Sequence, residues 1–427
     1  MRSLSIGALA ACLLGLVWMA GSPDPALGDS AAKIRGASEN PNAPPNSPKA
    51  ATRSPEESVS SAVKWLASVQ GENGGWGQDG GGTSFVRTGQ NLEFQGNDAA
   101  NTAVATLALI SAGSTPVSGE HKAQVRRGLE FVLRGVEASP DEGLAVTSVT
   151  GSQIQRKLGP FIDTFLTTRL LSKLDGETGD ARLDARVRAA LEKCVAKIEA
   201  NQQSDGSWNI SGGWAPILGT SMASRSLYAA RRKGVEVSEM VLAKGDGYAK
   251  QVAQAAPPPS AGGVVAGVIG GVPGGLGGGV GGGVFRVGGG SGTGVDSGRS
   301  VGLGESAGVE LYRDALVFES LSRTEQDRKD NAAELQAVSE KLGDARFVEG
   351  FGSYGGEEFF SYLNISDSLR REGGEAWEKW NDSIKTKLVR LQNEEGSWAG
   401  AHCITGRVAV TSAAVLTLLV ERDSPEL

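Results

Sequence analysis

Apolar residues recur at helical spacing along most of the chain, and three amphipathic segments share one pattern. Each has apolar side chains at i, i+3 and i+4, the period of an α-helix with one buried face. Each ends in a polar turn with the motif Gln-x-x-x-Gly-x-Trp, and a helix of small apolar residues follows it. The copies are Gln70, Gly74 and Trp76; Gln202, Gly206 and Trp208; and Gln392, Gly396 and Trp398. The pattern predicts an all-α chain of helical hairpins.

The chemistry of the motif is local. Glycine allows a tight turn after the carboxyl end of a helix, where a positive φ is often required. The glutamine amide is suited to bond backbone groups left without partners at helix ends, and the tryptophan ring can stack over it.

The spacing of the motif predicts a repeat of about 66 residues. Gln70 and Gln202 are 132 residues apart, which leaves room for one unit between them. Amphipathic helices expected at 124–136 and 161–174 fit that unit, although its Trp signature is lost. The distance from Gln202 to Gln392 exceeds two periods by 58 residues. We therefore expect about five hairpins, over residues 56–256 and 350–427, with an insertion between them.

The 58 extra residues between Gln202 and Gln392 coincide with a change in composition. Residues 257–304 include 21 glycines, so we expect a flexible insertion there. Residues 305–349 are highly charged with partial helical periodicity, and we expect a helix or helical hairpin that projects from the core as an arm for a partner.

The amino terminus reads as an export signal. Arg2 precedes an uncharged stretch over residues 4–20, and the small residues at Ala26 and Gly28 suit signal peptidase. We expect a signal peptide over residues 1–28 and a location in the periplasm or envelope of a bacterium. Residual membrane anchoring through residues 4–20 is the alternative. Residues 29–55 are expected to form a disordered spacer.

Composition narrows the class of protein. A formal net charge of −7 and an isoelectric point near 5.2 argue against nucleic acid as a partner. Three cysteines, one of them inside the leader, do not make a disulfide framework. Stability must then come from a large apolar core.

These residues resemble the prenyltransferase and squalene-oxidase repeat superfamily, the squalene-cyclase-like proteins. The resemblance covers residues 56–235 and 350–421, and it implies concentric rings of helices closed into an α/α toroid. The carboxyl segment is most similar to uncharacterised bacterial exported members, through residues 350–359, 362–366 and 402–407. Similarity to that group implies a fold and a location, but no reaction.

The motifs that carry the best-known chemistry of the superfamily are missing. Cyclases protonate an isoprenoid with an Asp-x-Asp-Asp motif, which this sequence lacks, and aromatic residues make up only 6% of the chain. The Asp-x-Cys zinc pattern of protein prenyltransferases and the Cys-Gly-Glu-Gln thioester run are also missing. His402 and Cys403 are weak candidates for a metal site, since no further ligands follow them. No cofactor is predicted.

One group of residues combines acid, base and cation near the ends of the last repeats. It comprises Glu357, Glu358, His402, Cys403 and Arg407. Together these side chains could perform acid–base chemistry on a sugar polymer. The preferred interpretation is a hydrogen-bonded lid that closes the last repeat, with Glu357 favoured by a helix dipole.

Two functions follow from the sequence. The preferred hypothesis is a non-catalytic scaffold or binding module of the envelope, whose partner is an envelope protein, a glycan or a lipid. The alternative is a diverged toroid enzyme that acts on a polysaccharide or a terpenoid.

Overall fold

The computed structural model describes residues 53–78, 96–210, 216–255, 310–350, 354–401 and 404–422. They all belong to one compact unit, Ser47–Leu427. The expected signal peptide, nearly all of the spacer and the glycine-rich insertion lie outside the described residues, as do His402 and Cys403.

The described residues form fifteen helices and no strand. The helices are α1 (Pro55–Ser68), α2 (Ala99–Ser111), α3 (Lys122–Ala138), α4 (Gln153–Leu158), α5 (Ile162–Leu174), α6 (Ala181–Ala200), α7 (Pro216–Arg232), α8 (Glu239–Gln254), α10 (Glu310–Leu321), α11 (Glu325–Asp330), α12 (Ala332–Lys341), α13 (Ala345–Val348), α14 (Gly356–Glu372), α15 (Gly374–Leu391) and α16 (Arg407–Leu418).

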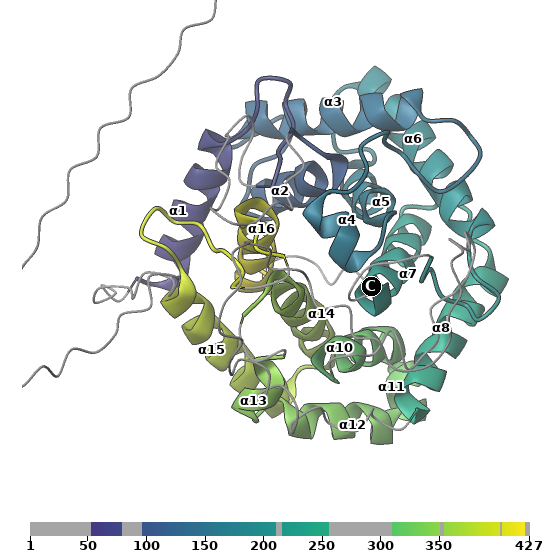
Figure 1. Cartoon of the computed structure of the whole chain (residues 1–427), viewed down its shortest axis with the longest axis vertical. Coiled ribbons are helices and arrows are strands. Elements are labelled where there is room, and N and C mark those ends of the chain that lie inside the picture. The colour runs from purple at the N-terminus through teal and green to yellow at the C-terminus, as the bar shows by residue number, and fades with distance from the viewer. Residues whose placement is uncertain are drawn as a thin grey trace, which may run out of the picture. The chain divides into compact units, whose positions relative to one another are not determined.

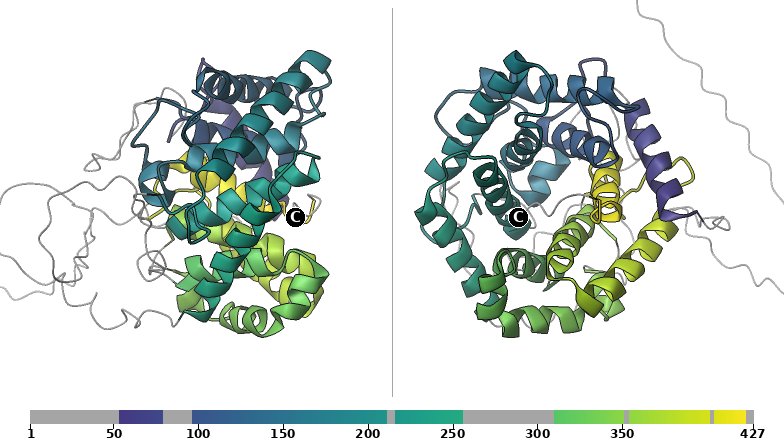
Figure 2. Two further views of the ribbon diagram at one scale, coloured as in Figure 1. Left: turned by 90° about the vertical axis from the view of Figure 1, so that its right-hand side faces the viewer. Right: turned by 180° about the vertical axis from the view of Figure 1, so that it is seen from behind.

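The helices are arranged in two concentric rings, which confirms the expected α/α toroid (Figures 1 and 2). The inner ring consists of α2, α5, α7, α10, α14 and α16, each packed against the next, and α16 closes the ring on α2. Where side chains are described, nearly all positions of these helices are buried, because each helix has neighbours on all sides. The outer helices are amphipathic, and their apolar faces pack on the inner ring.

The described residues form six hairpins of the toroid, one more than the sequence led us to expect. They are α1–α2, α3–α5, α6–α7, α8–α10, α12–α14 and α15–α16. Because the chain alternates between the rings, successive inner helices run in the same direction.

The expectation that the charged segment projects as an arm is wrong. It is helical, as predicted, but α10 is an inner-ring helix that packs against α7, α8 and α14, and its residues from Leu311 to Leu321 are all buried. The buried charges of this segment are paired inside the ring, as in the bonds from Arg323 to Glu319 at 3.0 and 3.1 Å. The charged residues of this segment led us to predict an exposed helix, whereas α10 belongs to the core.

Each of the three copies of the repeat motif fastens its own hairpin to the outer helix of the next hairpin. In the first copy, Nε2 of Gln70 donates to the carbonyl of Gly74 at 2.8 Å, within the turn, and to the carbonyl of Gln124 at 3.0 Å, in the first turn of α3. The Trp76 indole donates to the Leu66 carbonyl at 2.8 Å, which folds the turn back against α1. The glutamine thus bonds its own turn and the following outer helix.

The other two copies repeat this geometry. Nε2 of Gln202 donates to the carbonyl of Val241 at 2.8 Å, in the first turn of α8. Nε2 of Gln392 donates to the carbonyl of Ser58 at 2.8 Å, in the first turn of α1. The last clamp joins residues 334 positions apart and closes the outer ring.

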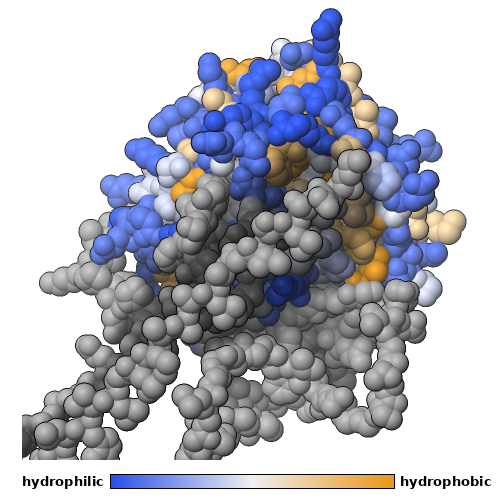
Figure 3. Space-filling model, turned by 45° about the horizontal axis from the view of Figure 1, so that its top comes forward, coloured by the Kyte–Doolittle hydropathy of each residue, from blue (hydrophilic) through white to orange (hydrophobic). Residues whose placement is uncertain are grey.

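The surface is mostly hydrophilic where Figure 3 shows described residues. Within the described part of the chain, the exposed large apolar side chains are Val117 and Met240. None of the described helices combines the length and the apolar character that a bilayer span requires.

Candidate functional site

Within the part of the chain that the structure describes, four buried carboxyl groups lie at the amino ends of the inner helices, and we call them the carboxylate layer. They are Asp98, Asp163, Glu357 and Glu358, each no more than 2% exposed. Asp98 is the N-cap of α2, whereas the other three lie in the first turns of α5 and α14. Because helix amino ends carry partial positive charge and free N–H groups, these positions favour carboxylates.

Glu358 uses both of its carboxylate oxygens. Oε2 accepts a hydrogen bond from the Gly355 amide at 2.9 Å, which caps α14, and Oε1 accepts one from the Tyr312 hydroxyl of α10 at 2.6 Å. Glu357 differs. Its Oε2 accepts a bond from the Ile404 amide at 3.1 Å, but its buried Oε1 has no partner.

Asp98 and Asp163 form the second pair, which sequence reasoning missed. Asp98 accepts bonds from the backbone and the side-chain amide of Asn101, both at 2.8 Å. Asp163 accepts one from the Ala100 amide at 3.0 Å, so both carboxylates cap the same helix, α2. An Asp directly before an alanine-rich helix is an N-cap signal that could have pointed to Asp98.

The short helix α4 links the two pairs. Oε1 of Gln153 accepts bonds from the Thr405 and Gly406 amides, both at 3.0 Å, next to the amide that bonds Glu357. Gln155 donates to Asp163 at 2.6 Å. The layer therefore forms part of a continuous network of buried hydrogen bonds.

Burial raises the pKa of Glu357, Asp98 and Asp163. It raises the pKa of Glu357 to about 7, with a further contribution from the charge of Glu358, and the Ile404 amide opposes the shift. Burial also raises the pKa of Asp98, where repulsion by Asp163 adds to the effect, and it raises the pKa of Asp163 itself. These carboxyls therefore hold protons close to neutral pH.

Arg407 is not part of this layer. Its guanidinium bonds Glu395 at 3.3 Å and lies 5.3 Å from the centre of the Trp65 ring. His402 and Cys403 lie outside the described residues, so the structure brings together only Glu357 and Glu358 of the five residues singled out in the sequence. Among the described residues there is no group of three or more His, Cys, Asp or Glu able to hold a metal ion.

A second buried polar group, the arginine cluster, lies between α7, α10 and α14. We define it by Arg225, Arg323, Arg371, Glu319 and Asp367. Arg225 bonds Asp367 at 3.2 Å, and the charge of Asp367 also faces Arg371 at 3.9 Å. Burial lowers the pKa of Arg371, but this group titrates far above physiological pH and stays charged.

Two rings of alternating helices joined by Gln-x-x-x-Gly-x-Trp clamps define an α/α toroid. Residues 48–149 match the model of a known family, the squalene-hopene cyclase C-terminal domain. This match confirms, for residues 48–149, the resemblance to squalene-cyclase-like proteins that the repeats predicted. No curated protein matches the chain.

Proposed function

We propose that this protein is a non-catalytic scaffold or binding module of the bacterial envelope, built on a squalene-cyclase-like toroid. The observation that carries the proposal is the use of the carboxylate layer. Asp98, Asp163 and Glu358 bond helix ends and neighbouring helices with both of their oxygens. Carboxylates committed in this way hold the inner ring together, and they are poorly placed to act on a substrate.

The sequence supports the same proposal. A cyclase needs a strong acid and an aromatic lining for carbocations, and the chain has neither the Asp-x-Asp-Asp motif nor many aromatic residues. The expected export signal adds a location where the partner is an envelope protein, a glycan or a lipid.

A diverged toroid enzyme is the second candidate, and one observation favours it. Oε1 of Glu357 is buried without a partner, and the pKa of this carboxyl is about 7. A carboxylic acid that stays protonated near neutral pH can serve as a general acid toward a polysaccharide or a terpenoid.

Two measurements on the purified full-length protein separate the candidates. We expect native mass spectrometry of protein isolated from the envelope to reveal a bound partner or ligand. We also expect incubation with squalene, or with envelope polysaccharide, to leave each compound unchanged by chromatography and mass spectrometry.

The contrary result is equally specific. Formation of a product that is lost in Glu357→Gln and kept in Glu358→Gln would overturn the proposal and establish the enzyme. Glu358→Gln is the matched control because glutamine retains an acceptor for the Gly355 amide.

A further inference from the structure

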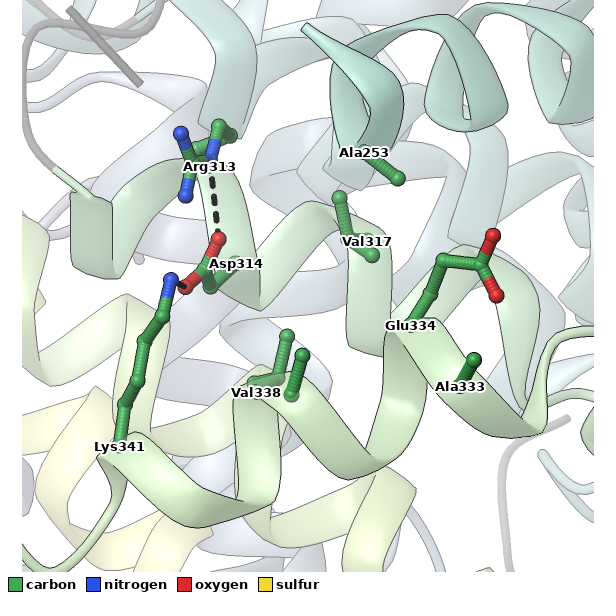
Figure 4. A pocket seen from close by; sticks show the side chains of 9 residues that line it. Ala253, Arg313, Asp314, Val317, Ala333, Glu334, Val338 and Lys341 are labelled. Atoms are coloured by element: carbon green, nitrogen blue, oxygen red, sulfur yellow. Dashed lines mark hydrogen bonds and ion pairs between the residues drawn. The ribbon is translucent and has the colours of Figure 1, made fainter. Parts of the chain in front are cut away.

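A groove of about 280 Å³ lies in the wall of the toroid, between α8, α10 and α12 (Figure 4). We call it the wall groove. One end carries Arg313, Asp314 and Lys341, and the other end carries Glu334. It lies in the wall between the two rings and shares no residue with the carboxylate layer.

The basic end of the groove has more donors than acceptors. Asp314 is buried and accepts bonds from Nε of Arg313 at 2.9 Å and from Lys341 at 2.7 Å. Arg313 is only 6% exposed, and its Nη1 has no hydrogen-bond partner. A guanidinium carries five N–H donors and a fixed charge, so this end lacks an acceptor.

The nearby acidic groups do not supply that acceptor. Glu310 is nearly half exposed and approaches only Lys341, at 3.9 Å. Glu334 lies at the far end of the groove, and within the described residues it makes no hydrogen bond or ion pair. A ligand that carries one anionic group would therefore find a partner at one end and repulsion at the other.

The middle of the groove is aliphatic and narrow. Val317 and Val338 are buried below it, and Ala337 is one of three alanines along it. The volume lies below the roughly 300–1,000 Å³ of pockets for drug-sized ligands, so the occupant must be small.

We propose that the wall groove binds a small monocarboxylate with a short aliphatic body. The carboxylate bonds Arg313, with Lys341 beside it, and the aliphatic body lies over Val317 and Val338. Glu334 rejects a second carboxylate at the far end. The inference is independent of the function proposed above, because the groove shares no residue with the carboxylate layer.

The test is a calorimetric titration of the full-length protein with hexanoate, hexylamine and adipate. We expect saturable binding of hexanoate, at least tenfold tighter than that of hexylamine, which has the wrong charge, or of adipate, which has a second carboxylate. Equal affinities for the three compounds, or no saturable binding of hexanoate, would overturn the proposal.

Variants place the ligand in the groove. Arg313→Met should weaken hexanoate binding at least tenfold, but a buried arginine is also a risk to folding. Ala337→Leu avoids this risk because Ala337 is at the surface, and it should obstruct the groove with the same loss of affinity. Ala332→Leu, on an exposed position of the same helix outside the groove, is the control. Unchanged binding in folded Ala337→Leu protein sinks the assignment.

Discussion

Replacing Gly206 with alanine tests why the repeat motif requires glycine. Gly206 has a φ of 92°, in the left-handed region. A Cβ at this position would also overlap the carbonyl group of Lys244 in α8, the helix to which the motif is clamped. The glycine therefore meets two requirements, one of conformation and one of space.

The two contributions have separate magnitudes. Forcing an L-residue into the left-handed region costs about 1–2 kcal/mol. The overlap with the Lys244 carbonyl costs about 1–3 kcal/mol more, because a backbone group cannot rotate away from the added Cβ. We therefore expect Gly206→Ala to lower the free energy of unfolding by about 3 kcal/mol.

Gly234→Ala is the matched control. Gly234 has a φ of 74°, but nothing lies within 4 Å of a Cβ built there. This variant should lose only the conformational part, about 1–2 kcal/mol. The assay is equilibrium unfolding in urea, followed by tryptophan fluorescence and circular dichroism with equal m-values. Equal losses in the two variants would refute the claim that close approach to α8 requires the glycine.

Three further predictions concern single side chains. Gln392→Ala removes both clamp bonds of the last repeat, so it should cost about 1–3 kcal/mol and increase proteolysis at α1; unchanged protection of α1 would contradict ring closure through Ser58. Glu357→Gln should flatten the pH dependence of the free energy of unfolding. The pKa of Glu357 rises from 4.5 to about 7 on folding, so its protonated form stabilises the fold fully below pH 4.5. This stabilisation, about 3 kcal/mol, is lost as the pH rises to about 7. Urea titrations across this pH range measure it, and an identical slope in the variant contradicts the assignment. Glu319→Gln removes one of the two carboxylates that pair with the buried Arg323, while Asp246 remains, and it should cost about 1.5–3 kcal/mol, whereas Glu325→Gln at an exposed pair should cost less than about 1 kcal/mol in the same unfolding assay; similar losses would mean that burial does not matter.

Much of the fold was predictable because its signals are local. The Gln-x-x-x-Gly-x-Trp copies and the apolar period place α1, α6 and α15 directly. The degenerate unit at α3 and α5 followed from spacing alone, and both helices lie within a few residues of the expected bounds.

The sixth hairpin could not be predicted in the same way. α10 carries Arg313, Asp314 and Glu319 in twelve residues, and such a composition normally indicates a solvated helix. Part of their pairing is local, since Arg313 bonds the adjacent Asp314 and Glu319 pairs with Arg323. The packing of α10 against α7, α8 and α14 buries these pairs, and that packing is a tertiary property that the local pattern does not show.

The carboxylate layer was also predictable only in part, from its local signals. The sequence placed Glu357 and Glu358 at a loop-to-helix junction near the end of a repeat, and both lie in the first turn of α14. Asp98 and Asp163 are 65 positions apart, and only the packing of α2 against α5 brings them together at one helix end. The rise that Asp163 causes in the pKa of Asp98 depends on this contact, so the sequence alone could not predict it.

The direction of the inner helices accounts for how charge is distributed within the ring. Parallel helices place their partial positive ends on one side and their negative ends on the other. The carboxylate layer lies at the amino ends, while Arg371 is in the last turn of α14 and Arg323 follows the carboxyl end of α10.

A helix dipole is worth about 0.3–1 kcal/mol for a nearby charge, whereas burial of an ionised carboxylate costs several times more. Desolvation therefore wins at Glu357, and its pKa rises although it lies at a helix end that favours its charge. An arginine remains ionised at any physiological pH, so the opposite end of the ring must satisfy its charges with paired acids such as Glu319 and Asp367. The two ends of one ring thus respond differently to pH: the carboxylate end takes up protons near neutrality, and the arginine end does not.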